Sequence, residues 1–153
     1  KLDTDNDFGL NLLQNAVLQN VREGKNSAGV VSGTATPIPI DYQSGSYHIY
    51  TLSGDTTFTF QNLPGDPRIV PVEITPVGVG KLTIELYNNG DDDWTVDFSL
   101  SGTGATSLKK DPDFPSLPLT VSQLDNVDNP IIIEVWRHSL ETIFVRYLGT
   151  YAE

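Results

Sequence analysis

The fold class is decided by residues 81–100, which read Lys81-Leu82-Thr83-Ile84-Glu85-Leu86-Tyr87-Asn88-Asn89-Gly90-Asp91-Asp92-Asp93-Trp94-Thr95-Val96-Asp97-Phe98-Ser99-Leu100. Apolar and polar residues alternate on both sides of the central Asn/Gly/Asp segment. A period of two is typical of a β-strand with one buried face, because successive side chains of a strand point to opposite sides. Asparagine, glycine and aspartate in sequence favour a turn. The stretch therefore predicts two strands, Lys81–Tyr87 and Trp94–Leu100, separated by a turn.

The same period of two extends over most of the chain from Thr34 onward. The other candidate strands are Thr34–Ile40, Ser46–Leu52, Thr56–Gln61, Ile69–Thr75, Pro130–Arg137 and Thr142–Leu148. Ser53-Gly54-Asp55 and Pro64-Gly65-Asp66-Pro67 are typical turn sequences. Residues 107–129 are less regular and contain several prolines, so we expect a long surface excursion there. About eight short strands with frequent turns predict an antiparallel β-sandwich or jelly roll.

A different period precedes these strands. The residues Leu10, Leu13, Val17 and Val21 form one apolar stripe at helical spacing, with Asn15 and Gln19 at its edge. We expect a short α-helix here, followed by a connector over Glu23–Gly33 that is rich in Gly, Ser and Asn. The chain then divides into an arm, helix and connector (residues 1–33) and a β-sandwich domain (residues 34–153). The stripe is buried against the chain's own sheet or, as the seam of a small parallel bundle, against other copies.

Composition excludes several classes of protein. The 153 residues carry 9 Lys+Arg and 20 Asp+Glu, a formal net charge of -11, and the basic residues are scattered. Binding to nucleic acid requires clustered cations, so we expect no nucleic-acid partner. No apolar run approaches the ~18 residues that span a bilayer, and we expect no membrane insertion. The chain has no cysteine, which excludes disulfides and thiolate metal sites.

Two segments resemble bacteriophage virion proteins. Residues 10–21, Leu10-Asn11-Leu12-Leu13-Gln14-Asn15-Ala16-Val17-Leu18-Gln19-Asn20-Val21, are similar to a segment near the start of phage fibre and appendage domains. Residues 40–60, Ile40-Asp41-Tyr42-Gln43-Ser44-Gly45-Ser46-Tyr47-His48-Ile49-Tyr50-Thr51-Leu52-Ser53-Gly54-Asp55-Thr56-Thr57-Phe58-Thr59-Phe60, resemble a recurring virion β-module. The loose counterpart of its closing strand is Tyr147-Leu148-Gly149-Thr150-Tyr151. The Trp-Pro-rich middle of that module is absent, and Asp91-Asp92-Asp93-Trp94 stands in its place.

The resemblance implies a non-enzymatic structural protein of the virion, on the capsid surface or in a tail appendage. It favours a capsid decoration protein, of the cement or head-fibre type, that binds and stabilises the shell and projects a β-sandwich outward. Its partners would be the chain itself as a homotrimer and the major capsid protein or other virion proteins. The alternatives are a tail-fibre or receptor-binding tip that recognises host surface glycan, and a free-standing carbohydrate-binding module.

Residues with catalytic or metal-binding chemistry are few. The only histidines are His48 and His138, and neither lies in a recognisable nucleophile motif, so we expect no enzyme and no cofactor. Alternation places His48 on one face with Tyr50 and Leu52, as a packed residue. The carboxylates of Asp91, Asp92, Asp93 and Asp97 are candidate ligands of a hard cation such as calcium, and the alternative is a solvated turn.

Aromatic residues are the remaining candidates for a binding surface. The sequence contains Tyr42, Tyr47, Tyr50, Trp94, Trp136 and Tyr151, whose flat rings suit either core packing or stacking against sugars. Trp136 lies in the apolar strand Ile131-Ile132-Ile133-Glu134-Val135-Trp136, which favours packing. Trp94 follows three aspartates at the start of a strand, which makes it the better candidate for exposure. The candidate ligand-facing residues are Trp94 and Tyr47, and the alternative for both is core packing.

Overall fold

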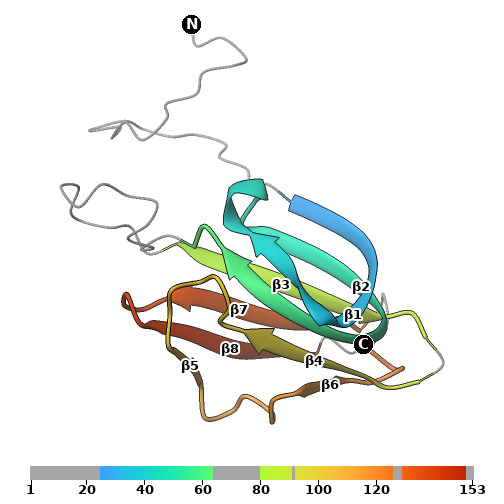
Figure 1. Ribbon diagram of the computed structural model, residues 1–153. Coiled ribbons are helices and arrows are strands. Elements are labelled where there is room, and N and C mark those ends of the chain that lie inside the picture. Colours follow the sequence, from blue (N-terminus) through green and yellow to red (C-terminus); the bar gives the residue numbers. More distant parts are fainter. Residues whose placement is uncertain (1–24, 64–79, 91, 126–128, 151–153) are drawn as a thin grey trace, which may run out of the picture.

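β-Strands dominate the residues that the computed structural model describes, which are 25–63, 80–90, 92–125 and 129–150 (Figure 1). The elements of this described part are β1 (Lys25–Asp41), the 3-10 helix η1 (Tyr42–Ser44), β2 (Tyr47–Gln61), β3 (Lys81–Asn88), β4 (Trp94–Ser99), β5 (Ser107–Lys110), β6 (Leu119–Val121), β7 (Ile131–Arg137) and β8 (Thr142–Thr150). The prediction of a mainly β protein is confirmed. The predicted α-helix over residues 10–21 and the predicted strand Ile69–Thr75 lie outside the described residues.

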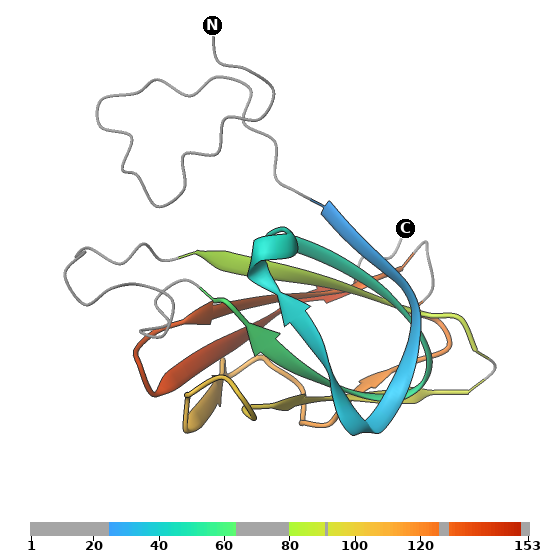
Figure 2. The ribbon, with the colours of Figure 1, turned by 45° about the horizontal axis from the view of Figure 1, so that its top comes forward.

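The two longest strands are bent in the middle, so each contributes to two walls of the sheet. The first arm of β2 pairs with β3 through Tyr47–Leu52, and its second arm pairs with β4 through Thr56–Thr59. β1 pairs in parallel with both arms of β2 and bends between them, as Figure 2 shows. β1, β2 and the β3–turn–β4 unit are therefore three bent layers stacked in parallel, which we call rungs.

The remaining strands extend the two walls. β7 pairs antiparallel with β3, β8 antiparallel with β7, and β5 parallel with β8, while β6 pairs antiparallel with β4. The result is one mixed sheet that curls into a half-barrel (Figure 2). The prediction of an antiparallel sheet is wrong. β3 and β4 are consecutive, but each pairs in parallel with one arm of β2, so they face each other across the core as two arms of one rung. The sequence does not reveal this, because side chains alternate in the same way in parallel and antiparallel strands.

Contacts between the bends hold the rungs in register. A Cβ atom at Gly54, at the bend of β2, would lie 3.0 Å from the Ser32 Cβ atom at the bend of β1, so the two backbones approach closely there. Asp55 joins the second rung to the third, because its Oδ1 atom accepts hydrogen bonds from the Thr95 backbone N–H at 2.8 Å and the Thr95 hydroxyl at 2.9 Å. The Asn89 N–H adds a bond to the Leu52 carbonyl at 3.0 Å. The bends are thus stacked directly on one another.

The core fills the space between the two walls. Tyr50 of the first wall meets Phe58 of the second with ring centroids 4.7 Å apart, although both rings belong to β2. Phe60 and Phe98 stack at 5.4 Å within the second wall. The fully buried aliphatic side chains around them include Ile40, Leu52, Leu63, Leu82, Ile84, Leu86, Leu119, Ile131 and Ile133. Each arm contributes alternate residues to this core, which is the period that the sequence predicts.

Three segments differ from the sequence-based prediction. Residues 25–33 of the expected connector belong to β1, and their polar sequence reflects an edge strand with little buried surface. Ser53-Gly54-Asp55 is the bend of a continuous strand, where a turn between two strands was expected. Residues 107–129, expected as a surface excursion, contain β5 and β6 and bury Phe114 and Val121. Strands as short as β5 and β6 do not show a clear period of two in the sequence.

A buried arginine fastens the β7–β8 connection to the rest of the sheet. Arg137 is 5 % exposed, and its guanidinium donates to the carbonyls of Ser139 at 3.1 Å, Thr103 at 3.0 Å and Leu140. Thr103 lies in the turn between β4 and β5. The Arg137 guanidinium thus joins two loops, because it donates hydrogen bonds to backbone carbonyls of both.

Replacing Arg137 by methionine should destabilise the protein by about 2–4 kcal/mol, because it leaves these carbonyls without their donor. The matched control is Arg146→Met. The Arg146 side chain is 54 % exposed and its ion pair with Asp111 is 3.7 Å long, so its loss should cost no more than about 1 kcal/mol. Urea unfolding of the two variants measures the difference. Equal losses of stability would contradict the assigned role of Arg137.

Candidate functional site

The first wall has a side that faces away from the core, and we call it the outer face. Its residues alternate with core residues along each strand and are cross-strand neighbours of one another. On β3 they are Lys81, Thr83, Glu85 and Tyr87; on β7 they are Ile132, Glu134 and Trp136; on β8 they include Phe144 and Arg146. Tyr47 and Ile49 of β2 continue the face on the other side of β3.

A buried carboxylate lies in the middle of the outer face. Glu85 is only 8 % exposed, and its two carboxylate oxygens accept hydrogen bonds from the hydroxyls of Tyr47 and Tyr87. Ile132 beside it on β7 is 7 % exposed. A carboxylate can be buried in this way when hydrogen-bond donors replace the water that it loses. The predicted ligand-facing residue Tyr47 is thus partly buried, and its hydroxyl is engaged with Glu85.

Aromatic rings gather at one end of the outer face. The ring centroids of Trp136 and Phe144 are 5.6 Å apart, and those of His138 and Phe144 are 4.6 Å apart. Lys81 Nζ lies 5.7 Å from the centre of the Trp136 ring. We call Trp136, Phe144 and His138 the aromatic cluster. Trp136 and Phe144 are partly exposed and His138 is exposed, so the cluster reaches the surface.

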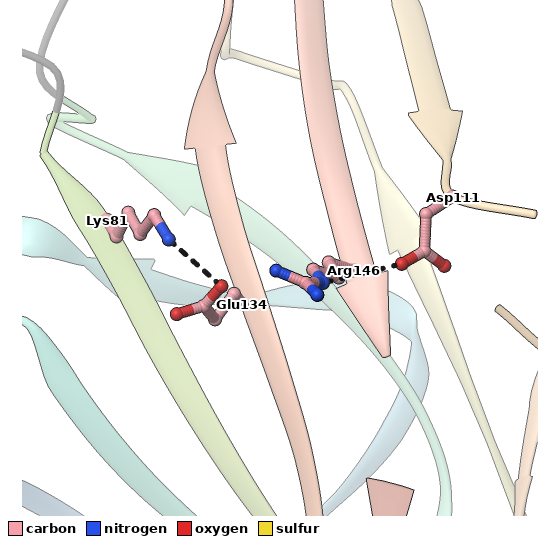
Figure 3. A network of polar contacts seen from close by, with 4 residues as sticks. All are labelled: Lys81, Asp111, Glu134 and Arg146. Atoms are coloured by element: carbon pink, nitrogen blue, oxygen red, sulfur yellow. Dashed lines mark hydrogen bonds and ion pairs between the residues drawn. The ribbon is translucent and has the colours of Figure 1, made fainter. Parts of the chain in front are cut away.

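A row of charged residues borders the aromatic cluster. Figure 3 shows Lys81, Glu134 and Arg146 on three adjacent strands, with Asp111 following β5. Lys81 Nζ lies 3.2 Å from Glu134 Oε2, and Arg146 Nε lies 3.7 Å from Asp111 Oδ2. Exposed pairs of this kind contribute little to stability. Their arrangement places hydrogen-bond donors and acceptors directly beside the aromatic rings.

The turn between β3 and β4 holds the other predicted site residues. Trp94 is partly buried against the core, and a Cβ atom at Gly90 would lie 2.5 Å from the Trp94 Nε1 atom, so the indole lies over the turn. Asn88 organises the same turn, with its amide nitrogen 2.9 Å from the carbonyls of Asp92 and Val121. The indole therefore packs against the protein with at least one side. A role of Trp94 in ligand binding stays a prediction.

The predicted cation ligands are divided between this turn and β4, which contains Asp97. Asp93 Oδ1 accepts a hydrogen bond from the Gln123 N–H at 2.9 Å, and Asp97 Oδ1 accepts one from the Phe98 N–H at 2.8 Å. Asp92 is exposed, and Asp91 lies outside the described residues. Within the described ranges, no three His, Asp or Glu side chains are grouped as metal ligands. A calcium site that includes Asp91 stays a prediction.

His48 is packed in the core, as its place in the sequence predicts. It is 1 % exposed on the same face as Tyr50 and Leu52. Its Nε2 atom lies 2.8 Å from the Gly45 carbonyl, which only accepts, so Nε2 carries the proton. The Nδ1 atom is then the acceptor for the Tyr50 hydroxyl at 3.5 Å. Burial raises the pKa of Tyr50 to about 12, which keeps this phenol neutral.

Neither the aromatic cluster nor Glu85 is predicted from the sequence. The predicted assembly residues lie outside the described residues: Leu10, Leu13, Asn15, Val17, Gln19 and Val21. No protein-family model, no curated protein and no solved structure matches this chain. Within the residues described, no helix is long and apolar enough to cross a bilayer.

The Tyr–Glu–Tyr cluster gives a test of the outer face. Tyr47→Phe and Tyr87→Phe should each destabilise the protein by about 1–3 kcal/mol, because each leaves one buried oxygen of Glu85 without a donor. The same changes made in a Glu85→Met background should cost less, since the acceptor is gone. Thermal or urea unfolding of the double-mutant cycle measures the coupling. Identical costs in both backgrounds would mean that the hydroxyls do not stabilise Glu85.

Asp125 gives a test that depends on pH. Burial raises the pKa of its carboxyl, Asp93 raises it further, and a hydrogen bond from the Ser122 N–H at 2.7 Å opposes the shift. A raised pKa means that ionised Asp125 costs folding stability. This cost is absent below the ordinary pKa of 3.8 and appears as the pH rises through the folded-state value.

Asp125→Asn should therefore stabilise the protein at pH 7, by up to about 1 kcal/mol, and the gain should shrink toward pH 3.5. Asparagine keeps an oxygen that can accept from Ser122. The control is Asp113→Asn, which removes a charge from an exposed position. Urea unfolding at both pH values measures the gain. A gain at pH 7 no larger than that of the control would contradict the raised pKa of the Asp125 carboxyl.

Proposed function

We propose that this chain is a non-enzymatic structural protein of a bacteriophage virion, acting as a capsid decoration protein of the cement or head-fibre type. The resemblance of residues 10–21 and 40–60 to phage appendage proteins supports the proposal. We propose that the N-terminal part forms the assembly element and that the curled β domain projects outward. The two walls of this domain face each other as the two sheets of a β-sandwich do. The chain contacts other copies of itself as a trimer, and shell proteins.

The structural observation that carries the proposal is the end rung of the sheet. In the described part of the chain, β1 pairs only with β2, although it extends from Lys25 to Asp41. Many of its side chains are exposed, and Val30 is 60 % exposed. An edge strand presents backbone N–H and C=O groups that pair readily with another chain.

The two arms of β1 differ in their capacity for such pairing. Pro37 and Pro39, in the second arm, lie two residues apart and so remove donors from the same side of the strand. A proline is tolerated in a paired strand when the side that lacks the N–H donor faces away from the partner strand. The partner of β1 is β2, so the missing donors lie on the side of β1 that faces away from β2. The first arm, residues 25–31, contains no proline. It is the arm suited to contact with a neighbouring subunit.

The proposed helix immediately precedes this arm in the sequence. Its stripe of Leu10, Leu13, Val17 and Val21 would form the seam of a parallel trimer, with Asn15 and Gln19 fixing its register. Trimers bound at junctions between capsomers would stabilise the shell by mass action, because they bind the assembled state and not its separated parts. No catalytic step is required.

The proposal predicts a trimeric mass that does not depend on concentration, measured by light scattering of the purified chain. The double variant Leu13→Asp/Val17→Asp should be folded and monomeric, since two carboxylates in each copy cannot be buried at the seam. Its matched control is Leu124→Asp/Leu140→Asp, which places the same charges at leucines that are 73 % and 57 % exposed.

The control should keep the mass of the parent protein. A parent chain that is monomeric at all concentrations would overturn the trimer, and a variant that stays trimeric would remove the helix from the interface. Circular dichroism of both variants separates loss of assembly from loss of folding.

A second candidate function is glycan recognition, as a tail-fibre tip or a free-standing carbohydrate-binding module. The aromatic cluster favours it, because partly exposed rings on a rigid sheet suit stacking against the apolar faces of pyranose sugars. This function and decoration of the capsid are compatible on one chain, since the outer face and the edge of β1 use different residues.

A further inference from the structure

The aromatic cluster is part of a row that crosses four strands. Lys81 on β3 is the cross-strand partner of Trp136 on β7, Trp136 is the partner of Phe144 on β8, and Phe144 is the partner of Lys109 on β5. Cross-strand partners share a face of the sheet, so two aromatic rings lie between two lysines. We call these four residues the cation–aromatic row.

The charge of this row is opposite to that of the whole chain. The chain carries 9 Lys+Arg against 20 Asp+Glu. Lys81 on β3, Lys109 on β5 and Arg146 on β8 nevertheless lie beside the aromatic cluster. Lys109 is exposed and forms no ion pair within the described part of the chain. The row therefore offers a positive charge to a ligand.

The rings and the flanking charges restrict the class of ligand. Partly exposed rings suit a molecule with a flat apolar face, such as a pyranose or a nucleobase. A nucleic acid is disfavoured by the net charge of -11, because every phosphate would be repelled by the chain as a whole. A neutral sugar would use the rings but would leave Lys109 without a partner.

We propose that the cation–aromatic row binds an acidic saccharide, a pyranose that carries a carboxylate. The sugar ring stacks on Trp136 and Phe144, and its carboxylate pairs with Lys109. Glu134, beside the rings, accepts hydrogen bonds from sugar hydroxyls. This inference rests on the second candidate function, glycan recognition, and does not depend on assembly into a trimer.

The test uses the full chain and two acidic probes, trigalacturonic acid and 3′-sialyllactose, with galactotriose and lactose as their neutral counterparts. Binding is followed by isothermal titration calorimetry and by tryptophan fluorescence. We expect an acidic probe to bind with a dissociation constant below about 10 mM and the neutral counterparts to bind at least about ten-fold more weakly. Added salt should weaken the binding.

Two adjacent lysines provide the matched pair of variants. Lys109→Gln should weaken binding of the acidic probe by at least about five-fold, because it removes the cation beside Phe144. Lys110→Gln removes the same charge from the next residue of β5, which faces away from the row and donates to the Pro115 carbonyl at 3.2 Å. It should bind as the parent does. Phe144→Leu, which keeps an apolar side chain, should weaken binding through loss of the stacking ring.

Each outcome is decisive. Equal weakening by Lys109→Gln and Lys110→Gln would mean non-specific electrostatic attraction and would overturn the proposal. Equal binding of acidic and neutral probes would overturn the acidic class while leaving glycan recognition in place. Binding of no probe at about 10 mM would overturn both. The light-scattering mass is unaffected by any of these results, so the assembly proposal stands or falls separately.

Discussion

The bend at the centre of each rung is the constraint on which the rest of the structure depends. Because β1 and β2 turn at their middle, two arms of one strand face each other across the core, as Tyr50 and Phe58 do within β2. The bends must stack for the arms to pair, and the absence of a side chain at Gly54 lets the bend of β2 approach Ser32 at the bend of β1. Asp55 then binds Thr95 of the third rung. The remaining strands extend walls whose spacing is already set.

Much of the local structure could be predicted from the sequence, and the topology could not. Alternation in residues 81–100 correctly located β3 and β4, and the apolar residues of the pattern in β3, Leu82, Ile84 and Leu86, are buried. It could not show that β2 continues through Ser53-Gly54-Asp55, since a bend and a turn use the same residues. It also missed the first half of β1, because an exposed edge strand has no apolar period. Pairing partners are set by contacts distant in sequence, and these have no local signature.

The candidate site was less predictable than the fold for the same reason. Trp136 was interpreted as a packing residue from its apolar strand, and this neglected the position that alternation gives it, opposite to Ile133 and Val135. Its neighbours Phe144 and Lys109 are known only once β7, β8 and β5 are in register. Glu85 is similar: a glutamate at an outward position of a strand is ordinary, and only the structure brings Tyr47 and Tyr87 to it. The sequence indicates whether a single residue is buried, whereas a cluster of residues from several strands can be identified only when the register between those strands is known.

The two prolines of β1 also bear on how far an assembly of this protein can grow. A stack of parallel rungs has no intrinsic end, and another copy could in principle continue it by laying a further bent strand on the first rung. Such a strand needs backbone donors along both arms, and Pro37 and Pro39 remove them from one. The end rung therefore acts as a terminator of strand-by-strand elongation. It favours closed oligomers of fixed size over open fibrils.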